Sequence, residues 1–116
     1  AGPTYARAVK AGDTLYISGC TARGSSEEGD SAMAQLRVTL DRVVKIVEAE
    51  GGTAQDIVKI TTFVTKMSDW YPVDQAQIDL FNEYFDGQNP ANSLVGITAL
   101  ALPGLDIEIE AIAVLG

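Results

Sequence analysis

Two segments with helical periodicity lie among short strand-like segments, and this order limits the fold more than any other feature of the chain. The first helix is expected after Asp30 or Ser31, either of which can cap it. Its apolar side chains recur every three or four positions and form one stripe: Met33, Leu36, Leu40, Val43, Val44 and Val47. Gly51 and Gly52 are suited to end it.

A second, shorter helix is expected between Asp69, which can cap it, and Gly87, which can end it. Pro72 then falls in the first turn, where its missing N–H is tolerated. The side chains expected on the buried side are Val73, Leu80, Phe81, Tyr84 and Phe85.

Five segments resemble strands because they contain β-branched and aromatic residues, and turns with glycine or proline separate several of them. They span residues 5–9, 14–18, 57–66, 93–100 and 105–114. The last one alternates clearly and places Ile107, Ile109, Ala111 and Ala113 on one face. The prediction is one α+β domain over residues 1–116, with two helices packed on one face of a mixed sheet.

The other face of this sheet is expected to carry Val95 and Ile97, or their neighbours, together with Ile112 and Val114. An apolar surface of that kind is unfavourable in water. We therefore expect the sheet faces to associate in a symmetric oligomer.

The chain has no histidine and a single cysteine, Cys20. This composition excludes Ser-His-Asp and Cys-His nucleophiles, histidine-ligated zinc and an intrachain disulfide. Acid–base chemistry is left to carboxylates, tyrosine, cysteine or water. A lone cysteine is compatible with a reducing, cytoplasmic environment.

The net charge of −8 and the scattered distribution of the eight basic residues argue against nucleic acid as a partner. No apolar run is long enough to span a membrane, and no signal peptide is recognisable.

Four segments, in order and with matching gaps over nearly the whole chain, resemble the RidA/YjgF family. They comprise residues 5–9 with 12–19, Gln35 with Gly51-Gly52, residues 56–61, and residues 84–85 with 89–93 and 107–113. The resemblance implies a chorismate-mutase-like fold, a homotrimer with a ligand cleft between subunits, and no cofactor or metal. It also implies hydrolysis of reactive enamines and imines, a small-molecule ligand, and cytoplasmic location.

The resemblance also implies a role for individual residues. Glu108 matches the acidic residue that acts on the attacking water, while Tyr5, Ser18 and Gly19 match residues that line the cleft. Asn92 stands where the family's Pro-Ala-Arg-Ser motif has its substrate-binding arginine. Two further departures are Cys20, where many members have glutamine, and Leu94, where cysteine is common.

Each of these residues also has a structural interpretation. Glu108 could be a solvent-facing strand residue, Asn92 a turn residue, and Cys20 a small buried side chain. Arg7 and Arg23 are the basic residues near the expected cleft segments, where they either replace the missing arginine or are solvated. Trp70 is expected to anchor packing before the second helix.

Three functions follow from these observations. The first is hydrolytic deamination of an imine or enamine, or cleavage of a related C–N bond. The second is binding or regulation by a trimer that keeps the cleft without catalysis. The third is ribonuclease or translation-inhibitor activity, which the acidic charge and the missing histidine disfavour.

Overall fold

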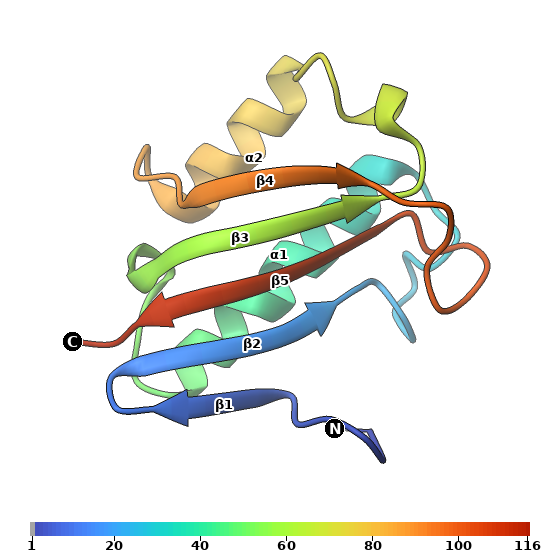
Figure 1. Ribbon diagram of the computed structural model, residues 1–116. Coiled ribbons are helices and arrows are strands. Elements are labelled where there is room, and N and C mark those ends of the chain that lie inside the picture. Colours follow the sequence, from blue (N-terminus) through green and yellow to red (C-terminus); the bar gives the residue numbers. More distant parts are fainter. Residues whose placement is uncertain (1) are drawn as a thin grey trace.

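A five-stranded sheet carries both α-helices on one of its faces in the computed structural model, which describes residues 2–116 (Figure 1). The elements are β1 (Ala8–Ala11), β2 (Thr14–Cys20), α1 (Ala32–Ala49), β3 (Ile57–Val64), α2 (Gln75–Phe85), β4 (Ala91–Gly96) and β5 (Ile107–Val114). Two 3-10 turns, Ala54–Asp56 and Met67–Asp69, precede β3 and α2.

The sheet is mixed, with strand order β1-β2-β5-β3-β4. The β1–β2, β2–β5 and β3–β5 pairs are antiparallel, whereas β3 and β4 are parallel. The predicted α+β architecture, with helices on one face of a mixed sheet, is therefore confirmed.

The core lies between α1 and the central strands. Five members of the predicted α1 stripe are buried, and Met33 is partly buried against them. They face β5, where the four alternating residues predicted to share one face are all buried. Burying a leucine or valine side chain contributes about 1.5–3 kcal/mol, so this layer is a large favourable contribution to folding.

The start of α2 was predicted wrongly. Asp69 belongs to the preceding 3-10 turn, and the N-cap is Asp74, whose side chain accepts a hydrogen bond of 2.9 Å from the Gln77 N–H. Pro72 follows a cis peptide bond and lies before the helix rather than in its first turn. Val73 is consequently 53% exposed instead of buried.

Strand boundaries also differ from the prediction at three places. β1 begins at Ala8, so Tyr5 lies in the segment before the strand. β4 covers Ala91–Gly96, and β5 begins only at Ile107, which leaves residues 97–106 as a connecting loop.

Gln35 fastens this loop to the start of α1. The side chain is fully buried, and its Nε2 donates to the carbonyls of Asp30 at 2.9 Å and Gly104 at 3.0 Å. Its Oε1 accepts from the Asp106 N–H at 2.8 Å. One amide therefore satisfies backbone groups from two segments that are far apart in the sequence.

We expect Gln35→Ala to lower the free energy of unfolding by about 2–4 kcal/mol, because it creates a cavity and leaves buried backbone groups unpaired. Urea denaturation measures this change, with exposed Gln88→Ala as the matched control. A loss no larger than that of the control would contradict the structural role of Gln35.

The sheet face away from the helices is partly apolar, as predicted. Val95 and Val114 are 37% and 46% exposed, and Ile112 is partly buried. Ile97, predicted on this face, lies just beyond the end of β4 and is also partly buried. Tyr16 extends the exposed surface on β2, opposite Ile112 of β5. Association through this face stays a prediction. Within residues 2–116, neither helix is long and apolar enough to cross a membrane.

Candidate functional site

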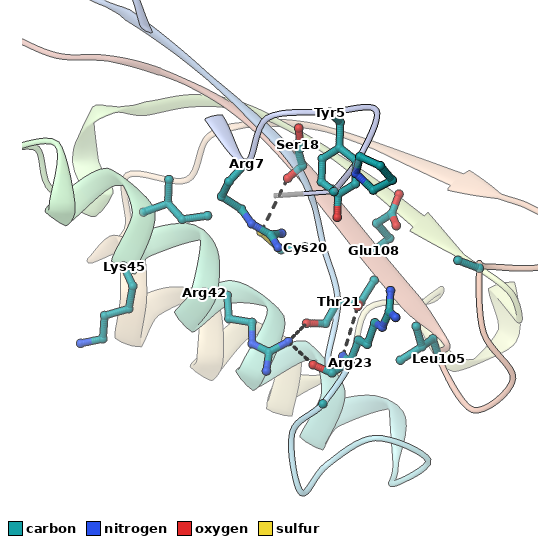
Figure 2. A pocket seen from close by; sticks show the side chains of 16 residues that line it. Tyr5, Arg7, Ser18, Cys20, Thr21, Arg23, Arg42, Lys45, Leu105 and Glu108 are labelled. Carbon is teal, nitrogen blue, oxygen red and sulfur yellow. Dashed lines mark hydrogen bonds between the residues drawn. The ribbon is translucent and has the colours of Figure 1, made fainter. Parts of the chain in front are cut away.

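An open hollow of about 1130 Å³ lies where the N-terminal segment passes the ends of β2 and β5. We call it the N-terminal hollow. The lining residues important for its chemistry are Tyr5, Arg7, Ser18, Gly19, Cys20, Arg23, Arg42, Lys45 and Glu108 (Figure 2). The structure thus brings together five of the six predicted site residues, and only Asn92 lies elsewhere.

A β-bulge in β2 shapes this hollow. Ile17 pairs with Ala111 and Cys20 with Ile109, so β2 uses one residue more than β5 between these pairs. Such a bulge bends a strand and redirects its side chains. Here it places Ser18 and Gly19 at the irregular position, beside the hollow.

Ser18 fastens the N-terminal segment across the bulge. Its N–H donates to the carbonyl of Arg7 at 3.0 Å, and its hydroxyl donates to the carbonyl of Ala6 at 2.6 Å. These two hydrogen bonds fix the backbone of the segment that carries the Tyr5 and Arg7 side chains. Ser18 therefore positions the wall of the hollow, whether or not it contacts a ligand itself.

The Glu108 carboxylate occupies the space in which a side chain at position 19 would lie. A Cβ atom added to Gly19 would be 2.5 Å from Glu108 Cδ and 2.6 Å from Oε2. The close approach of the carboxylate thus requires glycine at this position.

Burial raises the pKa of Glu108 above its ordinary value, and repulsion from Glu110 adds to the effect. No side-chain hydrogen bond among residues 2–116 involves the Glu108 carboxylate. A carboxyl with a raised pKa and free oxygens, in a hollow, is suited to exchange a proton with water or a ligand.

The raised pKa also predicts how stability changes with pH. The folded chain holds the Glu108 proton more tightly than the unfolded chain, so stabilisation is complete below the ordinary pKa of 4.5. It is lost as pH rises through the raised folded pKa. Glu108→Gln cannot ionise, so its melting temperature relative to wild type should increase with pH across this window. Thermal melts at stepped pH measure the difference, and a constant difference would contradict the assignment.

Cys20 is buried, as its structural interpretation predicted, and its thiol donates to the carbonyl of Ser18 at 3.6 Å. Burial raises the pKa of this thiol, although the nearby Arg7 guanidinium opposes the shift. The thiol therefore stays protonated at neutral pH and is a poor nucleophile.

Two basic residues of the hollow were missed from the sequence, Arg42 and Lys45. Arg42 Nη1 donates to the carbonyls of Thr21 and Arg23, both at 2.7 Å, and so holds the loop after β2. Their spacing of three residues on α1 was the available signal, because such residues share a helix face. The spacing does not show that this face of α1 packs against the loop after β2.

Asn92 lies in a second hollow, beside α2, with a volume of about 340 Å³. Its Oδ1 accepts a hydrogen bond of 2.9 Å from the Thr62 hydroxyl. Trp70 also lines this hollow; it is buried, as expected for a packing anchor, and its Nε1 has no partner among the described residues. In a single chain, Asn92 and Glu108 therefore serve different hollows.

The protein is a small α+β domain whose N-terminal hollow places one carboxylate, Glu108, near three arginines. Residues 1–115 match the model of the family described as endoribonuclease L-PSP. The chain is 37% identical to 2-iminobutanoate/2-iminopropanoate deaminase of Escherichia coli, over 95% of this chain and 86% of that protein.

Solved structures agree. A member of the YjgF/YER057c/UK114 family from Mycobacterium tuberculosis superposes with a TM-score of 0.81 at 33% identity, covering 97% of this chain and 88% of that one. TdcF of E. coli with bound serine superposes with a TM-score of 0.82 at 30% identity, covering 100% of this chain and 91% of that chain. The chain belongs to the RidA/YjgF family, whose family model carries the endoribonuclease L-PSP description.

Proposed function

We propose that the protein is a hydrolytic deaminase of small imines or enamines, or a hydrolase of a related C–N bond. The observation that carries the proposal is the half-buried Glu108 carboxyl, which has no side-chain hydrogen-bond partner among residues 2–116 and lies beside Gly19 in the N-terminal hollow. Relatives named as deaminases support the reaction type. No cofactor or metal ion is invoked.

Glu108 acts on water in this proposal. Its carboxylate accepts a proton as water adds to the C=N carbon and delivers that proton to the imine nitrogen, which becomes an amine. Collapse of this adduct breaks the C–N bond and forms the C=O bond, while the hydroxyl proton passes to the leaving nitrogen. Imine and water thus give a carbonyl compound and ammonia. Tyr5, Ser18, Gly19 and Cys20 shape the surrounding pocket.

The proposed active form is a cytoplasmic homotrimer. The partly apolar sheet face supports association, since such a surface is unfavourable in water. Association also offers a way to bring Asn92 of one subunit to Glu108 of another, since the two lie in separate hollows of one chain. Asn92 would then contact the substrate's polar group.

Asn92 alters substrate preference in this proposal. A guanidinium grips a carboxylate through two charge-assisted hydrogen bonds, each worth about 1.5–3 kcal/mol, whereas a neutral amide bond contributes about 0.5–1.5 kcal/mol. We expect Asn92→Arg to lower KM for short 2-imino acids about tenfold or more.

Ammonia release from freshly generated imines tests the proposal. Wild type and Asn92→Arg are compared, with Gln88→Arg, which is exposed and lines neither hollow, as the control. Wild-type activity on any imine supports the enzyme. If only Asn92→Arg is active, the native chain has another ligand. If neither is active, the second candidate, a non-catalytic small-molecule-binding trimer, replaces it; the serine bound to TdcF favours that alternative.

A further inference from the structure

We infer that Arg7 and Arg23 bind the two carboxylates of a small dicarboxylate, one on each guanidinium group, with the middle of the ligand near Glu108. The placement of the ligand's reacting carbon near Glu108 rests on the proposed function. The binding of its two carboxylates by Arg7 and Arg23 does not.

The charge of the N-terminal hollow is the first observation. Four of the chain's eight basic residues line it, against one carboxylate, although the whole chain carries a net charge of −8. Lys45 pairs with Glu48 at 3.8 Å. Three guanidinium groups against Glu108 then leave an excess of two positive charges, which a dicarboxylate neutralises.

The second observation is that two of these arginines have no carboxylate partner within residues 2–116, and that the Arg7 guanidinium lies beside the neutral Cys20 thiol (Figure 2). The ion pairs within residues 2–116 involve Arg37, Lys45 and Lys66, and neither Arg7 nor Arg23. Arg42 differs, because its Nη1 is occupied by two backbone carbonyls. A free guanidinium presents planar donors that match a carboxylate.

The backbone under both free arginines is fixed. The Arg7 carbonyl accepts from the Ser18 N–H at 3.0 Å, and the Arg23 carbonyl accepts from Arg42 at 2.7 Å. Figure 2 shows Arg7 and Arg23 on different sides of the opening, with Glu108 at its margin. Rigid attachment lowers the entropy lost when a ligand binds.

The size of the hollow agrees with this ligand class. Its volume of about 1130 Å³ exceeds what a three- or four-carbon monoacid fills. The hollow therefore has room for an acid with a second carboxylate at its far end.

Stable keto acids allow the inference to be tested without turnover. The dissociation constants of 2-oxoglutarate, 2-oxobutanoate and butan-2-one are measured by NMR titration of the full-length protein. The variants are Arg7→Gln, Arg23→Gln and the charge-retaining Arg7→Lys, with Arg37→Gln as control because Arg37 pairs with Glu83 outside the hollow.

The dicarboxylate should bind most tightly, and each glutamine variant should weaken it about tenfold or more. Arg7→Lys should recover part of this loss, and Arg37→Gln should match wild type. Equal binding of 2-oxobutanoate, or unchanged affinity in either glutamine variant, would overturn the inference. Ammonia release is measured separately on the same proteins. If the dicarboxylate binds in an arginine-dependent way but no imine releases ammonia, the inference is sustained and the proposed function is overturned.

Discussion

Glu108→Gln should lower the rate of ammonia release about 100-fold or more, because general acid–base catalysis contributes about 10²–10⁴-fold. The amide has nearly the shape of the carboxyl but cannot accept a proton from water. Substrate binding should change little, so the loss should appear in kcat rather than in KM. Steady-state ammonia release from the imine that the wild type hydrolyses fastest gives both kcat and KM.

Glu110→Gln is the matched control for this prediction. Glu110 points to the same side of β5, two residues further along, but does not line the N-terminal hollow. Glu110→Gln removes only the smaller of the two causes that raise the pKa of Glu108, so it should keep most of the activity. If both variants lose activity equally, the effect is one of general charge, and if neither loses it, Glu108 is not the acid–base group.

The arrangement of the layers was predictable because it depends on local patterns. The α1 stripe and the alternation of β5 each define one buried face, and two such faces leave few ways to pack. Prediction failed around α2, where Asp69 and Asp74 both offer a capping side chain. Only packing decides between them, and it selects Asp74.

The family resemblance predicted the identity of the site residues. It did not predict how the fold arranges them in space. The sequence scatters its basic residues, yet the fold places Arg7, Arg23 and Arg42 around one hollow. Non-local contacts cause this: Ser18 holds the Arg7 backbone, and Arg42 holds that of Arg23. Neither contact has a pattern in the sequence, since each joins segments separated by ten or more residues.

The requirement for glycine at position 19 leads to the second large effect. Gly19→Ala should lower kcat roughly 10–100-fold while leaving the fold intact, because displacing a catalytic group by about 1 Å can cost 10²-fold. The added methyl would meet Glu108 Cδ and Oε2, which lie at the end of a flexible side chain. The carboxylate can therefore move aside, and the free energy of unfolding should fall by less than about 1 kcal/mol. Gly96→Ala on β4 is the matched control, with Met67 Cε at 3.4 Å as its nearest contact.

A double variant separates displacement of Glu108 from other damage. If Gly19 matters only because it leaves room for the carboxylate, then Gly19→Ala should cost nothing further once Glu108→Gln has removed the proton acceptor. Two residues that act through one group lose their effects together, whereas independent effects multiply. Ammonia release from the four proteins of this cycle decides between them. Multiplying losses would show that Gly19 supports the reaction by another route, through its own backbone groups at the bulge of β2.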